Sequence, residues 1–509
     1  MNTCLFSQAG CRRQPVPRPE FPAERFGIRP GTGEDLTPAV QSALDTIGAG
    51  GGGTLLFGPG EYCFDGAVRL DFSNLGIRGA GDATRLRLRR AQTQLHFSAW
   101  LTPALLIAGT NLQGTEKFWG VKSKFPASEE RCAGVTNIPM SGDIYEAPFL
   151  STVVRVLGDR EFEVEDASPL SAGDFVLFAM RNTDDEGTLL KRMLNRSGEF
   201  HALQCGARLA GVTRAASFQF LAEVERVSGN RVRLTSPPPE KPDCAFEPAL
   251  YAAPLLTGIV IENLALVSDW RGPYLHHGGN RYSQAESKEM DYGWNAVKLF
   301  RCAHSIIRNV RIEDYTSGVE LVDSRNVTVS GLHIEDTTPH GGHYGVKVYC
   351  HAEQNLFEDI LLRSYRTHAI SCEGNAYGNV FRDFTVVDGD GEMVSEFDLH
   401  GFGDLPFAPP GYNLFEKITG IGRITGGGGK FNLPHSGRGN VFRDIEFNLR
   451  GDELFYSWIA PDTGEADYLE FPGTVLYSVH DPRRTIRIDG SAADRHDSHL
   501  DVTHLNHTL

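Results

Sequence analysis

Apolar and polar residues alternate in a five-residue segment that recurs six times between residues 296 and 434. The copies are AVKLF (296–300), GVELV (318–322), GVKVY (345–349), AISCE (369–373), EFDLH (396–400) and KFNLP (430–434). Successive side chains of a β-strand point to opposite faces, so the apolar second and fourth positions are expected to share a buried face. Val346, Val348, Phe397 and Leu399 are accordingly predicted to lie in the core.

A second pattern is interleaved with the first. An asparagine precedes an apolar pair and a short strand at Asn263, Asn309, Asn326, Asn355, Asn379, Asn413 and Asn440. The intervals are 46, 17, 29, 24, 34 and 27 residues. A β-helix coil takes roughly 20–30 residues, so the interval of 46 is interpreted as two coils. The recurrence predicts an all-β parallel β-helix from about Gly50 to Phe447, with the asparagines stacked at a coil corner.

The segment from Phe26 to Gly81 is predicted to begin this β-helix. Leu36, Val40, Leu44 and Ile47 have the spacing of a short amphipathic helix. A glycine loop, a buried strand and a Pro-Gly turn follow, and then two more strands. The helix is expected to cover the end of the coil, where the first strands would otherwise leave an unpaired sheet edge.

This segment resembles the N-terminal part of the pectate-lyase-like superfamily, whose pattern is FGA-GDG-D-T-AIQ-AI, then GGGTV-FPPG-Y, then SNV-L-G-G. The corresponding sequences here are FGIRPGTGEDLTPAVQSAL, GGGTLLFGPGEY and SNLGIRGAG, with Gly31-Thr32 where Gly-Asp is usual. The resemblance covers residues 26–81 only. It implies a right-handed parallel β-helix with an N-terminal capping helix, in a carbohydrate-active protein.

The coil pattern is lost between about Leu101 and Leu250. VVRVLGDREFEVED and FLAEVERVSGNRVRLTS are strand pairs around Gly-Asp and Gly-Asn turns, and a short helix is expected near 189–194. This part is predicted to be a β-rich insertion. The expected organisation is an N-terminal arm (1–25), the cap and first coils (26–100), the insertion (101–250), the main coils (251–448) and a C-terminal cap or tail (449–509).

Composition narrows the class of partner. The 509 residues carry a formal net charge of −16, which argues against a nucleic-acid surface because such a surface needs clustered Lys and Arg. The 56 glycines suit a fold with many tight turns. Nine cysteines without metal-ligand spacing are expected mainly as reduced structural thiols, with Cys350 and Cys372 buried.

Targeting signals are not apparent in the sequence. The N-terminal residues lack the apolar stretch of a signal peptide, and no later stretch is long and apolar enough for a membrane span. As written, the chain is expected in the cytoplasm, or secreted or periplasmic if an export signal was removed. The oligomeric state is left open.

The polar positions of the first pattern are predicted to face solvent and to form columns on the outer side of the β-helix, with strands about 4.8 Å apart. The central column should contain Lys298, Glu320, Lys347, Ser371, Asp398 and Asn432. Flanking columns add Tyr349, Glu373, Glu396, His400 and Lys430. Carboxylates, lysines, a tyrosine and a histidine on neighbouring coils indicate an active or binding face, and a solvated polar surface is the alternative.

The segment from Glu396 to His400 is the richest part of this face. Its Phe-Asp-Leu-His resembles the Phe-Asp-Pro-His of mannuronan epimerases, β-helix enzymes whose His and Asp work at the C5 proton of uronates. The candidate catalytic residues are Asp398, His400, Lys347, Tyr349, Glu373 and Glu396. The candidate substrate-binding residues are Glu320, Arg366, His368, Lys430, Asn432, Trp294 and His343. DGDGE (388–392) has the oxygen density of a possible Ca²⁺ site or forms a plain turn, and no other cofactor is indicated.

Three functions fit these residues, all with a polysaccharide or oligosaccharide as partner. A uronate lyase, slightly favoured, would use His400 or Lys347 as base, Tyr349 as acid and Arg366 or Lys430 against the substrate carboxylate. A glycoside hydrolase, resembling polygalacturonases in fold, would pair Asp398 with Glu373 or Glu396. A non-catalytic, tailspike-like glycan-binding module is the third. The glycan, its linkage and exo or endo action are left open.

Overall fold

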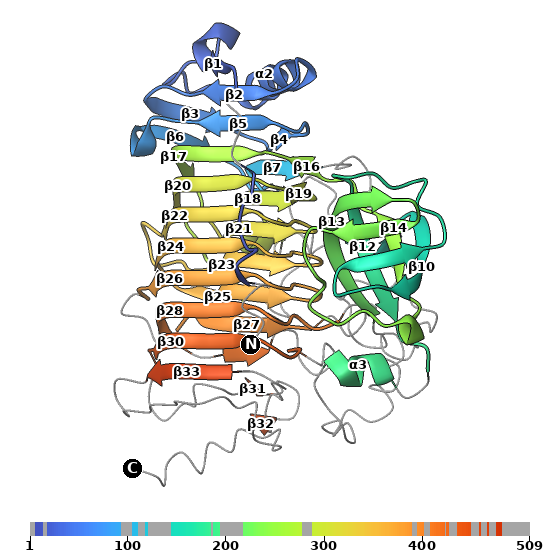
Figure 1. Ribbon diagram of the computed structural model, residues 1–509. Coiled ribbons are helices and arrows are strands. Elements are labelled where there is room, and N and C mark those ends of the chain that lie inside the picture. Colours follow the sequence, from blue (N-terminus) through green and yellow to red (C-terminus); the bar gives the residue numbers. More distant parts are fainter. Residues whose placement is uncertain are drawn as a thin grey trace.

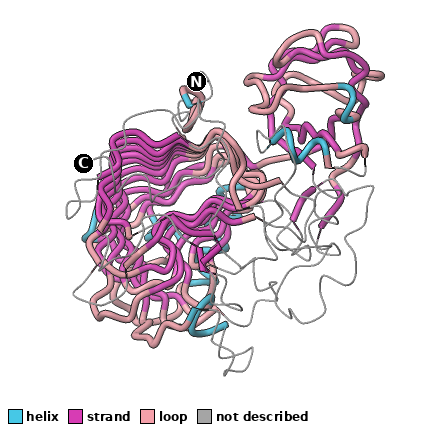
Figure 2. Tube along the Cα trace, turned by 90° about the horizontal axis from the view of Figure 1, so that it is seen from below, coloured by secondary structure: helices cyan, strands magenta, loops and turns pink. Residues whose placement is uncertain are grey.

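The computed structural model describes most of the chain as a parallel β-helix with an inserted barrel (Figure 1). The described residues are 6–13, 18–92, 104–109, 118–120, 144–184, 187–193, 217–276, 288–388, 394–401, 408–422, 424–426, 435–448, 458–459, 466–467 and 475–480. Seen along the coil axis, the strands of successive coils stack above one another and the barrel lies beside them (Figure 2).

The longer of the two main sheets, sheet A, has thirteen parallel strands. Along its main path the order is β1 (Glu20–Pro22), β2 (Gly53–Leu56), β5 (Leu75–Arg78), β17 (Val260–Ser268), β20 (Ile306–Glu313), β22 (Thr328–Glu335), β24 (Leu356–Arg363), β26 (Val380–Val386), β28 (Leu414–Ile421), β30 (Val441–Phe447) and β33 (Val475–His480). Off this path, β6 (Thr84–Leu88) pairs with β17 and with β3 (Gly60–Phe64).

The second sheet, sheet B, has eight parallel strands. Its order is β4 (Val68–Leu70), β7 (Leu106–Gly109), β18 (Asn295–Phe300), β21 (Ser317–Val322), β23 (Gly342–Tyr349), β25 (Arg366–Glu373), β27 (Glu396–His400) and β29 (Ile424–Gly426). A short third ladder joins β16 (Leu256–Thr257) to β19 (Cys302–Ala303) and continues as single bridges through Arg325, Glu353, Tyr377 and Gly411.

The β-helix core is where the alternation places it. Val346, Val348, Phe397 and Leu399 are at most 1% exposed and belong to one hydrophobic cluster between the sheets. On the sheet A side, the rings of Phe357, Phe381, Phe415 and Phe442 stack from coil to coil at centroid distances of 4.5–5.2 Å. The fold prediction is therefore confirmed.

The predicted spacing of the first coils is wrong in one place. Val260 of β17 pairs directly with Ile306 of β20, so the interval of 46 residues is one coil. The extra length lies between β17 and β18, in residues 269–294, which we call the excursion. The sequence pattern did not distinguish this segment from a coil. At the other end, β33 extends sheet A beyond Phe447, and most of 449–509 lies outside the described residues.

Six of the seven asparagines of the pattern fall into two structural environments. Asn355, Asn379, Asn413 and Asn440 form the interior ladder, each with its side-chain oxygen accepting from the backbone N–H of the preceding ladder residue or of Val327. Asn263 and Asn309 instead lie within sheet A strands at positive φ, where Asn is better tolerated than most residues. The same sequence pattern therefore occurs both in a hydrogen-bonded asparagine ladder and at strand positions with positive φ.

We expect Asn379→Ala to lower the free energy of unfolding by at least ~2 kcal/mol, because it leaves several buried polar groups unpaired. The Asn379 amide donates to Ala352 O and Asn413 Oδ1, and its oxygen accepts from Asn355. Chemical denaturation measures the change. Asn448→Ala, at an exposed position, should stay within ~0.5 kcal/mol, and equal effects would contradict a structural ladder.

The predicted insertion is a closed antiparallel barrel beside the coil. Its strands are β10 (Phe149–Val156), β11 (Glu161–Val164), β14 (Arg231–Leu234), β13 (Ser217–Ser228), β12 (Phe175–Arg181) and β15 (Ala249–Ala252), with α3 (Thr188–Met193) close to its predicted place. β7 falls within 101–250 yet belongs to sheet B, so the coil reaches further than that boundary. Short pairs form between β8 (Phe118–Gly120) and β9 (Ile144–Glu146), and between β31 (Trp458–Ile459) and β32 (Ala466–Asp467).

The barrel docks on the corner of the coils that follows the sheet B strands. Buried Arg325 donates to Leu221 O at 2.9 Å, His304 lies 2.9 Å from Glu223, and His351 lies 3.2 Å from Gln219. Such buried polar contacts fix the barrel against the coil because an unpaired charge there would be costly. The barrel therefore flanks the C-terminal ends of the strands that carry the candidate residues.

The N-terminal end of the coil is closed by α2 (Thr37–Ala49). Val40, Leu44 and Ile47 are buried, as predicted, and Leu36 is buried at the helix start. The other short helices of the described residues are the 3-10 helices η1 (Ala23–Phe26), η2 (Gly81–Ala83) and η5 (Cys244–Phe246), and the π-helix η7 (Lys288–Tyr292). Within the described parts of the chain, none of the helices has the length and apolar character to cross a membrane.

The six cysteines within the described residues are free thiols. Cys350 and Cys372 are fully enclosed, as expected, and burial raises the pKa of both thiols well above the usual range.

Candidate functional site

The outward columns of sheet B form as the alternation predicts. Strand pairing aligns Lys298, Glu320, Lys347, Ser371 and Asp398 in one column. A neighbouring column contains Tyr349, Glu373 and His400, and a third contains Tyr344, His368 and Glu396. We call these aligned residues the sheet B face.

The last coil departs from the prediction. Asp398 pairs with Thr425 of β29, so Thr425 occupies the place expected for Asn432. Lys430 and Asn432 themselves lie outside the described residues, as do 389–392 of the possible Ca²⁺ segment. Asp388, the first residue of that segment, accepts from the Ser395 backbone N–H at 2.8 Å and from its hydroxyl at 2.5 Å.

The expectation that this face is open to solvent is wrong. Asp398, Glu373, Lys347 and Tyr349 are at most 2% exposed, and His400 is 7% exposed. Alternation shows only that a side chain points away from the coil interior, and it does not show what else covers that side. Burial changes the chemistry of the face because charges removed from water must be paired or must shift their pKa.

A chain of polar contacts joins three coils of this face. Lys347 Nζ lies 2.8 Å from Glu373 Oε1, and the Ser371 hydroxyl lies 3.0 Å from the same oxygen. The hydroxyl also lies 2.7 Å from Asp398 Oδ2. Asp398 Oδ1 is buried without a hydrogen-bond partner among the described residues. Asp398 and Glu373 thus share one serine, whereas Glu396 is turned to Thr425 at 3.1 Å.

A single serine proton makes the two carboxylates unequal. The Ser371 hydroxyl can donate to only one acceptor at a time, so two ionised carboxylates cannot both be satisfied by it. A protonated Asp398 resolves this by donating to Ser371 Oγ, which then donates to Glu373. The geometry therefore favours a neutral Asp398 beside an ionised Glu373.

The pKa shifts have the same directions. Burial raises the pKa of Asp398 to about 6, with His400 acting in the opposite direction. Burial would also raise the pKa of Glu373, but the charges of Lys347 and His400 and the hydrogen bonds from Lys347 and Ser371 lower it below its ordinary value. When their surroundings push the pKa values of two neighbouring carboxyl groups apart, the group with the higher pKa can act as acid and the other as base.

Tyr349 is placed to hold Lys347 rather than to reach a ligand. The Lys347 ammonium lies 4.3 Å from the Tyr349 ring centroid and 4.2 Å from that of Tyr344, within the range of cation–π contacts. Burial raises the pKa of Tyr349 well above its usual range, so its phenol is a weak proton donor. On the two preceding coils, Lys298 and Glu320 form a separate ion pair at 3.0 Å.

His400 adjoins the carboxylate pair from the end of β27. Its Nδ1 lies 2.6 Å from the carbonyl oxygen of Gly401. A carbonyl can only accept, so a neutral His400 carries its proton on Nδ1 and its lone pair on Nε2. That arrangement suits a base or an acceptor.

Two predicted substrate-binding residues have structural roles instead. Arg366 is fully buried and makes two 2.8 Å hydrogen bonds to the carboxylate of Asp336, with further bonds to Ser364 and to backbone carbonyls, so both terminal nitrogens of its guanidinium are engaged within the protein. Trp294 packs against Trp270 at a centroid distance of 5.9 Å inside the hydrophobic cluster and cannot stack on a sugar. Aromatic and basic character alone did not distinguish core from surface.

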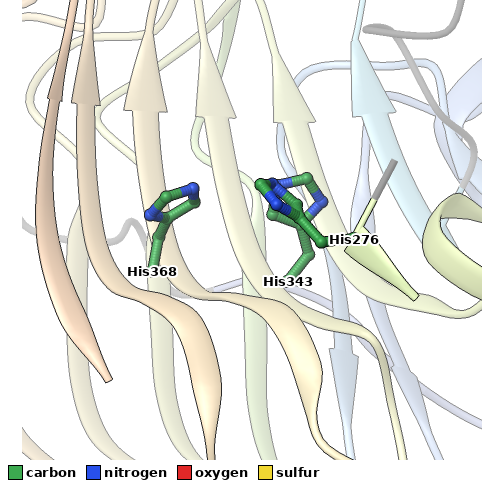
Figure 3. A group of neighbouring side chains, drawn as sticks. All are labelled: His276, His343 and His368. Atoms are coloured by element: carbon green, nitrogen blue, oxygen red, sulfur yellow. The ribbon is translucent and has the colours of Figure 1, made fainter. Parts of the chain in front are cut away.

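Three histidines that the sequence did not predict to meet lie near the N-terminal ends of β23 and β25. His343 of β23 and His368 of β25 lie beside His276, which comes from the excursion after β17 (Figure 3). The available ring nitrogens of the three residues lie within 4.8 Å of one another. The sequence predicts only sugar binding for His343 and His368, because residues 276, 343 and 368 have no short metal-ligand spacing.

Comparisons with known proteins identify the fold. No protein-family model and no curated protein sequence matches the chain. The tailspike protein gp49 of Pseudomonas phage LKA1 is 14% identical, with a TM-score of 0.50 over 84% of this chain and 59% of that one. The tailspike gp61 of Pseudomonas phage phi297 is 12% identical, with a TM-score of 0.49 over 90% of this chain and 62% of that one. An exopolygalacturonase from Thermotoga maritima is 11% identical, with a TM-score of 0.36 over 96% and 98% of the two chains.

The chain thus spans about three fifths of the length of the two tailspikes. At 14% identity, the likeness to the phage LKA1 protein shows a shared fold and nothing about activity. The chain has a right-handed parallel β-helix fold, as its N-terminal sequence implied.

Proposed function

We propose that this chain is a carbohydrate-active enzyme that hydrolyses glycosidic bonds of a polysaccharide or oligosaccharide at the sheet B face. The carrying observation is the carboxyl pair Asp398 and Glu373, joined through Ser371 and unequal in pKa. Glycoside hydrolysis needs one carboxylic acid to protonate the leaving oxygen and one carboxylate on the other side of the reacting carbon. Asp398 is the proposed acid.

Glu373 is the proposed nucleophile. The Ser371 hydroxyl oxygen lies 3.0 Å from Glu373 Oε1 and 2.7 Å from Asp398 Oδ2. The distance between these two carboxylate oxygens therefore cannot exceed the sum of the two contacts. Inverting enzymes need a gap of about 6.5–9.5 Å to hold a water, whereas retaining enzymes use about 5–5.5 Å. The close pair supports retention of configuration. Lys347 would keep Glu373 ionised, and Ser371 would hold the two groups in register.

β-Elimination is the second candidate, supported by His400 with its lone pair on Nε2 near the ionised network. Two other residues predicted for elimination are less suitable, because the terminal nitrogens of Arg366 bind Asp336 and burial raises the pKa of the Tyr349 phenol well above its usual range. Hydrolysis therefore replaces elimination as the preferred reaction.

Product analysis tests the proposal. The full chain is incubated with polygalacturonate, alginate and a panel of neutral and capsular polysaccharides, and reducing ends and ultraviolet absorbance are recorded. Hydrolysis gives new reducing ends without absorbance, and NMR should show the retained anomer as first product. Absorbance from an unsaturated uronate would support elimination instead. Binding without new ends across the panel would contradict both reactions.

The pH dependence of kcat/KM should follow the carboxyl pair. Because Asp398 must be protonated to act as acid, kcat/KM is expected to fall as the pH rises through about 6. Because the pKa of Glu373 is lowered, the acidic limb should lie below the ordinary glutamate range. Initial rates from pH 3 to 9 measure both limbs. A kcat/KM that rises through pH 6 would instead indicate a catalytic base and contradict the role of Asp398 as acid.

A further inference from the structure

Three histidines from separate parts of the chain converge on the outer side of sheet B. The ring centroids of His276 and His343 lie 4.7 Å apart, those of His343 and His368 5.5 Å, and those of His276 and His368 5.6 Å. Figure 3 shows the three rings turned toward a common space in front of β23 and β25. Each ring offers a nitrogen, and these nitrogens lie within 4.8 Å of one another.

The surroundings of the rings are those of metal-ligating histidines. Asp291 Oδ1 lies 2.6 Å from His343 Nδ1, and both side chains are fully buried. In metal sites, a carboxylate bonded to one ring nitrogen fixes the orientation of a histidine whose other nitrogen binds the ion. His368 is 8% exposed, and its Nδ1 has no hydrogen-bond partner in the described part of the chain. Most buried polar atoms of proteins have a hydrogen-bond partner, and an ion is one of the groups that can satisfy such a nitrogen.

A second group of potential ligands shows what a purely structural cluster looks like. Asp314, Asp336 and His340 also lie within ligand distance of one another. Their carboxylates, however, are already paired with Arg271 at 3.0 Å and Arg366 at 2.8 Å. Bound arginines repel a cation and occupy the oxygens that would hold it. The carboxylate of Asp291, which contacts His343, instead adds negative charge beside the histidines.

We propose that His276, His343 and His368 bind one divalent transition-metal ion of the Zn²⁺ class, with Asp291 orienting His343. Imidazole nitrogens suit Zn²⁺, Cu²⁺ or Ni²⁺, whereas Ca²⁺ prefers oxygen ligands. At Zn–N distances of ~2.0–2.1 Å the rings need only draw together slightly. Three protein ligands leave a fourth position open for water or a ligand oxygen.

The ion would join the excursion after β17 to the sheet B face. His343 precedes Lys347 by four residues and His368 precedes Ser371 by three, so the ion would lie ~10 Å along the strands from the carboxyl pair. Its open position would face a neighbouring part of a bound glycan, as a site for a hydroxyl or carboxylate oxygen. Metal binding itself stands on the histidine geometry and does not depend on the proposed hydrolysis.

Metal titration of the full chain tests the site. After chelator treatment and desalting, Zn²⁺ is titrated against a chromophoric competitor, and bound zinc is counted by elemental analysis. His276→Ala is expected to bind one Zn²⁺ fewer than the unsubstituted chain. His276 is exposed, so this variant should fold normally. Asp291→Asn should keep the site but weaken it by ~10–100-fold, as loss of an orienting carboxylate does.

His340→Ala is the matched control, because it alters the neighbouring Asp314–Asp336–His340 cluster and should leave zinc binding unchanged. Zn²⁺ should also raise the Tm of the unsubstituted chain, because a ligand bound only by the folded state stabilises it, and the rise should be absent in His276→Ala. Equal zinc content in the unsubstituted chain and His276→Ala would overturn the proposal, as would loss of that zinc in His340→Ala alone. These readouts need no substrate, so they remain decisive if the chain proves not to be a hydrolase.

Discussion

Replacing Asp398 by asparagine is expected to lower kcat by ~10²–10⁴-fold, the range that a general acid contributes. Asparagine keeps the shape and can still hydrogen-bond to Ser371, but it has no proton to give to a leaving group. Rates on the glycan found by product analysis, measured at pH 5 where the acid is largely protonated, give the comparison.

The stability of the same variant separates catalysis from folding. The pKa of Asp398 is raised in the folded state, so its contribution to stability is complete below the ordinary aspartate pKa and is lost as the pH rises through about 6. Asp398→Asn should remove this loss and unfold at no lower denaturant concentration than the unsubstituted chain at pH 8. Asp383→Asn, at an exposed position of β26, is the control and should keep normal turnover. Near-normal turnover in Asp398→Asn would place the active site elsewhere.

Replacing Glu373 by glutamine is expected to reduce turnover by at least ~10²-fold, because an amide cannot replace an ionised carboxylate as nucleophile. It also leaves Lys347 without its charged partner in a buried place, so a loss of stability of ~3–5 kcal/mol is expected from breaking the pair. Turnover per folded molecule and denaturant unfolding are measured together.

A control for this loss of stability is available on the other sheet. Glu262 of β17 is also buried and paired with arginine, at 2.5 Å from both Arg78 and Arg308. Glu262→Gln should destabilise the chain without changing the turnover of the folded molecules. If the two glutamate variants lost turnover in proportion to stability, Glu373 would be a structural residue only.

Several features of this protein follow from local sequence. Val346 and Val348 are interior and Lys347 is not, because side-chain direction along a strand depends only on the parity of the position. The column from Lys298 to Asp398 follows from the same parity combined with coil-to-coil stacking. The capping helix was equally predictable, since its apolar spacing and the glycine loop after it are local signals.

Other features depend on which distant segments meet. The alternation that placed Asp398 outside the coil carries no information on whether that side is covered, yet burial is what raises its pKa to about 6. Arg366 was expected to meet a substrate carboxylate, and its partner is Asp336 of the preceding coil region. Trp294 is predicted from the sequence to lie on a loop surface, but its ring is buried in the hydrophobic cluster of the β-helix.

The sequence by itself determined which face of each strand each residue occupies, and so the core and the column from Lys298 to Asp398. Only the tertiary structure decided that Glu373 rather than Glu396 is joined to Asp398, and that His276, His343 and His368 meet. The physical reason is range. Side-chain parity is set by one residue's neighbours in the chain, whereas burial, ion pairing and ligand geometry are set by contacts between residues tens of positions apart, which strand pairing and loop length jointly bring within a few ångströms.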